Sequence, residues 1–280
     1  GLYTAVTDDG VLHECRARGI FRHQGTKPLI GDRVRIQTDA DGVCAICDIL
    51  PRHSALIRPP MANLDILFVV AAAARPDPFP LLIDKLMLSA ERQNIEPVLI
   101  ITKGDLDETQ ASQLCADYRR CGFEAFCTAM DSQGNLSGVE LLRTRVLTLC
   151  RGRLAAFSGV SGAGKSTLLN ALFPQLMLET GALSQRIGRG KNTTRSVELF
   201  PLGEQEESAL QRGYLADTPG FSLLEFSRLA DCSKEELPGL FREFSPYIGQ
   251  CRYTKCSHTK EQDCAVRSAV AKGEIPVGRH

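Results

Sequence analysis

One stretch of the sequence decides the fold, and it reads Leu154-Ala155-Ala156-Phe157-Ser158-Gly159-Val160-Ser161-Gly162-Ala163-Gly164-Lys165-Ser166-Thr167. Residues 159–166 fit the pattern G-x-x-x-x-G-K-[ST], which forms a loop around phosphate groups when a strand precedes it and a helix follows. The apolar run 154–158 predicts that strand, and leucines at positions 168, 169 and 172 predict the helix. A glycine-rich turn before a helix is the structural alternative, and the matching context on both sides disfavours it. The stretch therefore predicts a nucleoside triphosphate site.

Each part of this loop has a chemical task. The glycines allow backbone N–H groups to turn inward around the phosphates, and the positive end of the helix dipole adds to their attraction. Lys165 would place its ammonium group on the β- and γ-phosphates, while the hydroxyl of Ser166 would be a ligand of Mg²⁺. We therefore expect every residue from Gly159 to Thr167 to line the nucleotide, with Mg²⁺ as its cofactor.

A second motif, Thr102-Lys103-Gly104-Asp105, favours guanine as the base of that nucleotide. It follows the apolar run 97–101 and fits the pattern [NT]-K-x-D. A carboxylate at the last position can accept two charge-assisted hydrogen bonds, from guanine N1–H and N2–H₂, which adenine does not offer. We expect Asp105 to read the base and the stem of Lys103 to lie against it. An ordinary P-loop ATPase or kinase, in which the tetrapeptide is accidental, stays open as an alternative.

Two segments further along the chain are candidates for sensing the γ-phosphate. In the segment Asp217-Thr218-Pro219-Gly220, Asp217 would reach Mg²⁺ through water and the N–H of Gly220 would meet the γ-phosphate. Upstream of it, Thr193 and Thr194 could close over Mg²⁺ as a switch loop. Ras-like proteins carry the guanine motif last, whereas here it comes first. The order is therefore that of a circular permutation, which a parallel sheet tolerates when its old ends lie close together.

The chain is expected to have three parts. Residues 1–57 consist of short apolar runs separated by glycines, which favours a small β-barrel. Residues 58–226 alternate strand-like and helix-like runs, which predicts a parallel sheet with helices on both faces, and residues 227–280 end this rhythm. The expected strands are 11–17, 32–37, 44–50, 66–71, 97–101, 123–127, 154–158 and 213–216. The expected helices are 81–92, 109–120, 136–150, 234–244 and a short one after Asp263.

A cysteine- and histidine-rich segment near the C-terminus predicts a metal site. Cys251, Cys256, His258 and Cys264 have the spacing C-x4-C-x-H-x5-C. Three sulfurs and one nitrogen within fourteen residues suit a closed, tetrahedral, structural Zn²⁺ site, in a segment with few apolar residues for a core. Incidental thiols are the alternative. The pair Cys44 and Cys47 also fits C-x-x-C, and we expect those two to be buried thiols of a strand.

Composition excludes several other classes of protein. The 43% of hydrophobic and 24% of charged residues are those of a globular chain, which excludes disorder, collagen and coiled coil as the main architecture. The longest apolar run, 66–74, is far too short to span a bilayer. Nothing at the start resembles a signal sequence, and an odd count of 11 cysteines disfavours a disulfide framework. We expect a cytoplasmic monomer without a membrane partner.

Together these motifs resemble one family, the circularly permuted GTPases that depend on the small ribosomal subunit, known as RsgA or YjeQ. The resemblance runs from the strand opening at 31–34 to the four candidate metal ligands. It implies an α/β fold in which an OB-fold β-barrel precedes a circularly permuted Ras-like P-loop GTPase domain, and a zinc-binding helical domain follows. It also implies a function: GTP hydrolysis, stimulated by the small ribosomal subunit late in that subunit's maturation, with GTP and GDP as ligands.

The chain departs from the family pattern at the catalytic position. The family usually reads Gly-Arg-Gly-Lys-His-Thr-Thr in the switch, and here Asn192 takes the place of the histidine. Phe221 stands where Ras-like proteins carry the glutamine that orients water. Asn192 cannot act as a base but can hold a water through its amide, so it is our candidate catalytic residue. The family pattern also leads us to expect a first barrel strand before Gly1 and a C-terminus beyond His280.

Clusters of basic residues on this neutral chain, with 33 basic and 33 acidic residues, point to local contacts with ribosomal RNA. Solvated surface charge is the alternative explanation for them. One cluster includes Arg16, Arg18, Arg22, Lys27, Arg33 and Arg35; the other includes Arg186, Arg189, Lys191 and Arg195. With Asn192 and Phe221 in place, a second hypothesis for function stays open: a nucleotide-gated module that binds ribosomal RNA and hydrolyses little GTP.

Overall fold

The structure of the chain is a computed structural model, and it describes residues 2–23, 25–40, 42–56, 60–174, 198–203, 208, 211–217 and 232–280. The described residues divide into two compact units. The first draws on Gly1–Ile66, Thr144–Ala156 and Arg189–Pro219. The second draws on Leu67–Arg143, Phe157–Gly188 and Gly220–His280.

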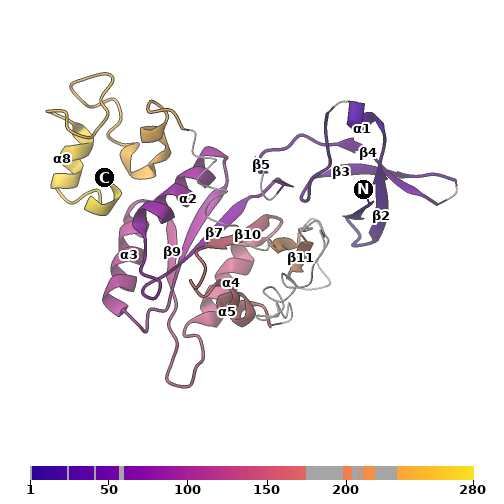
Figure 1. Ribbon diagram of the computed structural model, residues 1–280, viewed down its shortest axis with the longest axis horizontal. Helices are drawn as coiled ribbons and strands as arrows, with labels where there is room; N and C mark the ends of the chain where they lie inside the picture. Colours follow the sequence, from indigo (N-terminus) through magenta and orange to yellow (C-terminus); the bar gives the residue numbers. More distant parts are fainter. Residues whose placement is uncertain are drawn as a thin grey trace. The chain divides into compact units, whose positions relative to one another are not determined.

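The N-terminal part is a small four-stranded sheet (Figure 1). Its strands are β1 (Leu2–Val6), β2 (Leu12–Ala17), β3 (Val34–Thr38) and β4 (Cys44–Ile49), in the order β1-β2-β4-β3, with the short helix α1 (Ile20–His23) after β2. The small core of this sheet consists of Cys15, Phe21, Cys44 and Ile46.

The sequence predicted three of these four strands to within two residues. The pairing of β2 with β4 is parallel and places Cys15 opposite Cys44, whose sulfurs are 3.2 Å apart. The prediction of a buried thiol is confirmed for Cys44, whereas Cys47 is half-buried. Strand β1 was not predicted; its inward residues Tyr3 and Ala5 pack against this core, while Leu2 is mostly exposed. A two-stranded ribbon of β5 (Ala55–Leu56) and β6 (Met61–Ala62) follows.

The central sheet has six strands in the order β11-β12-β10-β7-β8-β9. Their bounds are β7 (Ile66–Ala72), β8 (Glu96–Thr102), β9 (Glu124–Cys127), β10 (Leu154–Gly159), β11 (Glu198–Leu202) and β12 (Gly213–Asp217). Every residue of β7 and β10 is buried, as expected of parallel strands covered on both faces. The predicted parallel pairing is confirmed for β10 with β12 and for β8 with β9, whereas β11, a strand that was not predicted, pairs with β12 in the antiparallel direction.

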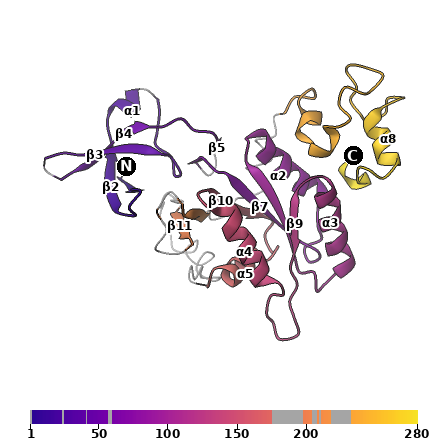
Figure 2. The same cartoon turned by 180° about the vertical axis from the view of Figure 1, so that it is seen from behind.

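Helices cover both faces of this sheet, because each crossover between parallel strands requires one. They are α2 (Pro80–Arg92), α3 (Glu108–Arg120), α4 (Val139–Cys150) and α5 (Lys165–Leu172), close to the predicted ranges. Figures 1 and 2 show α2 and α3 side by side on one face of the strands. No helix among the described residues is both long and apolar enough to cross a membrane.

The C-terminal part, residues 232–280, has little regular structure. The prediction of a helix at 234–244 is wrong: two short 3-10 turns, η3 (Leu237–Leu240) and η4 (Arg242–Phe244), stand there instead. Pro238 has no N–H for a helical ladder and explains the break. The predicted short helix is α8 (Ala265–Ala271), and a last turn, η5 (Val277–Arg279), ends the segment.

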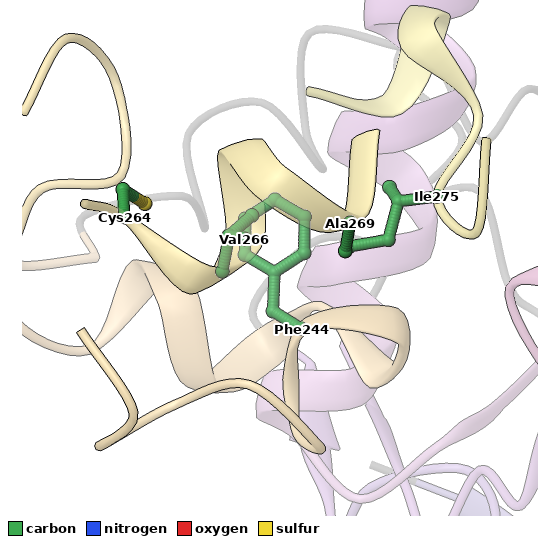
Figure 3. Close-up of a cluster of buried hydrophobic side chains, with 5 residues drawn as sticks. All are labelled: Phe244, Cys264, Val266, Ala269 and Ile275. Carbon is green, nitrogen blue, oxygen red and sulfur yellow. The ribbon is translucent and has the colours of Figure 1, made fainter. Parts of the chain in front are cut away.

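The core of this C-terminal part is small. Its buried side chains, drawn in Figure 3, are Phe244, Cys264, Val266, Ala269 and Ile275. Phe244 packs against α8 through Val266 and Ala269, and Cys264 lies at the start of that helix. Five side chains are too few to hold nearly fifty residues, so the segment needs further support.

Part of that support is a buried ion-pair cluster that joins the C-terminal part to α2. The guanidinium of Arg279 is 2% exposed and donates to Asp84 on α2 and, over 2.7 Å, to Glu243. Three aromatic rings surround its Cζ atom, with centroids 5.1 Å away for Tyr118, 5.5 Å for Phe123 and 5.0 Å for Phe241. Burial is the main cause of the raised pKa of the Asp84 carboxyl, and the charge of Arg279 opposes it.

Replacing Arg279 by Met should cost about 3 kcal/mol of unfolding free energy at pH 7, because two buried carboxylates would lose their cation. Burial already raises the pKa of Asp84, and without Arg279 the charge that opposes that shift would be gone, so the deficit should shrink as pH falls toward 5 and Asp84 takes up a proton. Urea unfolding of Arg279→Met at both pH values checks this. Arg35→Met, which removes an exposed pair with Asp48, is the control with a change near zero. An equal deficit at both pH values would contradict the assignment.

Candidate nucleotide and metal sites

The phosphate-binding pattern lies where the sequence predicts, between β10 and α5. Gly159 ends the buried strand, and a Cβ atom on it would lie 2.2 Å from the carbonyl oxygen of Val70 on β7, so only glycine fits. Gly164 has φ of +82° and occupies the position before the first turn of α5. The first N–H groups of any α-helix lie outside its own hydrogen-bond ladder, so the start of α5 suits an anion site.

The side chains of the loop divide by exposure. Ala163 is buried, Val160, Gly164 and Lys165 are half-buried, and the rest, Ser161, Gly162, Ser166 and Thr167, are exposed. Ser166 and Thr167 at the start of α5 are therefore accessible to a nucleotide with its Mg²⁺. Leu168 and Leu172 are fully buried and anchor the helix on the sheet.

The predicted guanine motif contacts this loop directly. Thr102, the last residue of β8, is 4% exposed, and its hydroxyl donates to the carbonyl of Ala163 in the loop. The same hydroxyl lies 3.3 Å from the carbonyl oxygen of Ala71 on β7. Two motifs that are 61 residues apart in sequence are thus joined by a buried hydrogen bond. This contact places the candidate phosphate and base positions at one edge of the sheet.

The remaining motif residues are held in a tight turn. Lys103 has φ of +58°, and its ammonium group donates to the carbonyl of Arg75 in the loop after β7. Gly104 is buried, and its N–H donates to Thr128 over 3.0 Å. Asp105 is exposed, and its Oδ1 accepts a 2.8 Å hydrogen bond from the N–H of Met130, which fixes the carboxylate.

These contacts reveal a site segment that the sequence did not indicate, Thr128–Met130. It follows β9, which pairs in parallel with β8 and so ends at the same edge of the sheet. Thr128 is 2% exposed, its N–H donates to Ile101 over 2.8 Å, and its carbonyl receives the N–H of Gly104. The sequence did offer one indication of this segment: it follows a predicted strand, 123–127, whose end should lie at the same edge of the sheet as the ends of 97–101 and 154–158. Backbone donors such as Met130 N–H have no sequence signature.

The other predicted γ-phosphate residues are described only in part. Asp217 is the last residue of β12, one position beyond Ala216, which pairs with Ala156 of β10 in the parallel ladder. Its place at a strand end is as predicted. Asn192, Thr193, Thr194 and Gly220, together with Phe221, lie outside the described residues.

The four predicted metal ligands converge. One donor atom from each of Cys251, Cys256, His258 and Cys264 lies within 4.8 Å of the others. The sulfurs of Cys251 and Cys264 are 3.8 Å apart, and each is 3.5 Å from Nδ1 of His258. Tetrahedral zinc, with bonds of about 2.3 Å to sulfur and about 2.0 Å to nitrogen, would place two sulfurs about 3.8 Å apart and a sulfur and a nitrogen about 3.5 Å apart. These three separations match a zinc tetrahedron.

Neighbouring groups support this donor set. The N–H of Ala265 points at the Cys251 sulfur over 3.4 Å, and the N–H of Arg267 at the Cys264 sulfur over 3.5 Å. Such donors stabilise thiolates, the form that zinc binds. Burial lowers the pKa of His258, which favours the neutral ring that a metal requires. The C-terminal His280 donates from Nε2 to the carbonyl of His258 over 2.6 Å.

The basic residues of the N-terminal cluster are exposed, and the one acidic residue among them, Asp32, forms an ion pair with Arg52. The side chains of Arg16, Arg18, Lys27, Arg33 and Arg35 are all exposed. Asp32, the acid among them, pairs with Arg52 through two hydrogen bonds of 2.7 and 2.8 Å. The other basic cluster lies outside the described residues, as does the side chain of Arg22.

Comparisons with known proteins agree with this fold and with these motifs. The family model described as RsgA GTPase matches residues 49–227, and the one described as RsgA N-terminal domain matches residues 1–46. A curated relative from Geobacillus kaustophilus, called small ribosomal subunit biogenesis GTPase RsgA, is 40% identical over 279 residues, covering 98% of this chain and 89% of the relative. A protein of the same name from Caldanaerobacter subterraneus is 39% identical over 281 residues, covering 100% of this chain and 89% of that protein.

Solved structures give the same result. YjeQ from Thermotoga maritima has a TM-score of 0.77 and 31% identity, over 99% of this chain and 90% of that one. YloQ, described as a circularly permuted GTPase, has a TM-score of 0.75 and 32% identity, over 100% of this chain and 87% of that one. Both the permuted fold and the family resemblance read from the motifs are confirmed.

Proposed function

Because this chain belongs to the RsgA GTPase family, we propose that it hydrolyses GTP as a factor in the maturation of the small ribosomal subunit. The observation that carries the proposal is the buried hydrogen bond from Thr102 to Ala163, which joins the guanine motif to the phosphate loop. A base on Asp105 and phosphates on Lys165 would then belong to one nucleotide. The names of the relatives supply the subunit as the partner.

In this proposal, different residues bind the phosphates, the Mg²⁺ and the base of the nucleotide. The loop from Gly159 to Thr167 holds the phosphates with its amides and with the ammonium group of Lys165. Ser166 offers a hydroxyl to Mg²⁺, with Asp217 as its water-linked second contact. The exposed carboxylate of Asp105 accepts from guanine while the N–H of Met130 holds its Oδ1 in place. Thr193, Thr194 and Gly220 are assigned to the γ-phosphate from their motifs alone.

Equilibrium titration with nucleotides tests the binding half of this proposal. Purified chain with Mg²⁺ should bind GDP and GTP, and should bind ADP and ATP at least about 100-fold more weakly, because adenine lacks both donors that a carboxylate reads. Equal affinity for guanine and adenine nucleotides would instead favour the ATPase or kinase alternative.

We further assign the position of Asn192 to water positioning in hydrolysis. A side-chain amide can hold a water but cannot remove its proton, so unassisted turnover should be slow. Asn192→His should raise the turnover stimulated by small subunits by about 10-fold or more, because an imidazole can accept the proton. Phosphate release with Asn192→Ala alongside checks this, since the alanine variant should stay below wild type. A lower rate in Asn192→His would contradict the expected gain from a base at this position and would show that hydrolysis depends on the amide itself.

The remaining parts of the proposal concern partners and domains. The exposed cations at Arg16, Arg18, Lys27, Arg33 and Arg35 are proposed to contact the backbone of ribosomal RNA, so subunit binding should weaken steeply with salt. We propose residues 1–57 as an OB-fold domain, 58–226 as the GTPase domain and 227–280 as the zinc-binding domain. One structural zinc, a monomeric state and a cytoplasmic location complete the proposal.

A further inference from the structure

The loop after β7, residues 73–79, is attached to the guanine motif. At its start, the N–H of Ala73 donates to the carbonyl of Thr102 over 2.8 Å. Two residues further on, the carbonyl of Arg75 accepts a hydrogen bond from the ammonium group of Lys103. Both partners belong to the predicted guanine motif, so this part of the loop is fixed to the end of β8.

The same loop also lies along the phosphate loop. A Cβ atom built on Gly162 would be 3.6 Å from Cδ of Pro76, which is an ordinary van der Waals contact. A small cavity of about 50 Å³ is lined by Pro76 and the three residues after it, by Gly159 and Val160, and by residues of β7 and α2. Arg75 comes directly before Pro76 in the chain. It therefore lies where the guanine motif and the phosphate loop meet.

The side chain of Arg75 is available to a ligand. It is exposed, and among the described residues it has no hydrogen-bond or ion-pair partner. Other arginines of the same compact unit are engaged: Arg119 donates to the carbonyl of Ala125, and Arg242 donates to Glu96 over 2.9 Å. Arg75 also has φ of +50°, in the left-handed region that non-glycine residues rarely adopt. Backbone of this kind is concentrated at sites that hold ligands.

We propose that the guanidinium of Arg75 binds the phosphates of the nucleotide, as a second cation beside Lys165. A guanidinium presents its donors in a planar fork that matches phosphate oxygens, whereas an ammonium group acts as a point charge. The inference rests on the nucleotide site proposed above, but it does not depend on the base, because the contact is to phosphate. A solvated surface cation is the alternative, and it predicts no effect of Arg75 on nucleotide binding.

The test compares three variants of the full chain. Arg75→Gln removes the charge but keeps a β-carbon, so the backbone at a positive φ has the same steric cost as in wild type. Arg75→Lys keeps the charge and loses the fork. Lys85→Gln removes an exposed cation from α2 and is the control with the same change in net charge. GDP and GTP affinities are measured by equilibrium titration with Mg²⁺ at low and at high salt.

We expect Arg75→Gln to weaken GDP and GTP binding by about 10-fold at low salt, the effect of one lost hydrogen bond to a charged group. Arg75→Lys should recover part of this loss, because it restores the charge without the planar fork. Lys85→Gln should bind both nucleotides as wild type does. Salt at about 1 M should narrow the difference between Arg75→Gln and wild type, because it screens an exposed contact.

Three results would overturn the contact. The first is wild-type affinity in Arg75→Gln. The second is an equal loss in Arg75→Gln and Arg75→Lys that salt does not change, which would indicate an altered loop instead of a lost charge. The third is an equal loss in Lys85→Gln, which would indicate a general effect of net charge.

A failure of the proposed function would be recognised separately, from the wild-type chain. If wild type bound ATP in place of GTP, the proposed guanine specificity would be wrong, and titration of the same variants with ATP would decide whether Arg75 contacts phosphate. If wild type bound neither nucleotide, both the proposed function and the role of Arg75 would be wrong.

Discussion

Asp105→Asn should weaken GDP and GTP binding by roughly 1,000-fold, which corresponds to about 4 kcal/mol. The wild-type carboxylate can accept from both N1–H and N2–H₂ of guanine, whereas the amide of asparagine directs an N–H₂ group at a base that also presents donors. The hydrogen bond from Met130 can persist on the amide oxygen, so the turn should keep its shape. Titration with each nucleotide measures the change.

The matched ligand for this variant is xanthosine diphosphate. Xanthine carries a carbonyl at position 2 in place of the amino group, so the asparagine amide would find one donor and one acceptor. Asp105→Asn should therefore bind xanthosine diphosphate more tightly than wild type does, which separates altered recognition from misfolding. Unchanged GDP affinity in the variant would show that Asp105 does not read the base.

Removal of zinc should unfold the C-terminal part, residues 232–280. Only five buried side chains form its core, and a structural zinc contributes about 10 kcal/mol or more to such a segment. Purified protein should contain one zinc per chain. Stripping it with a strong chelator should make the segment from Cys251 to Cys264 sensitive to trypsin, while the sheet and α2 stay resistant.

Two cysteine variants complete this experiment: one removes a zinc ligand, and the other is its control. Cys264→Ser removes a ligand that also caps α8, and it should reduce the zinc content to near zero. Cys47→Ser removes a thiol far from the cluster in sequence and should keep one zinc per chain. A zinc-free wild-type protein with the same proteolysis pattern and melting temperature would contradict a structural metal.

Sequence patterns predicted those features that local residues determine. The fully buried runs of β7 and β10 have no polar interruption, and the phosphate loop needs glycine where Gly159 meets Val70 and where Gly164 takes a positive φ. The four metal ligands lie within fourteen residues, so their spacing alone predicted the cluster that the structure brings together.

The features that sequence missed depend on contacts between distant residues or on the backbone. Arg279 meets Asp84 across 195 positions, and no pattern in either segment indicates that pair. The role of Met130 belongs to its N–H, which every residue but proline has. The failed helix at 234–244 shows the opposite limit: its composition favours a helix, but Pro238 lacks the N–H that a continuous helix needs, and 3-10 turns form instead.

Phosphate release from GTP, with ATP in parallel and with and without purified small ribosomal subunits, tests the central claim most directly. The account predicts slow release from GTP by the chain alone, strong stimulation by subunits, and no stimulated release from ATP. Flat GTP turnover in the presence of subunits would contradict a subunit-dependent GTPase. It would favour a nucleotide-gated binding module, with Asn192 as the first residue to replace by histidine.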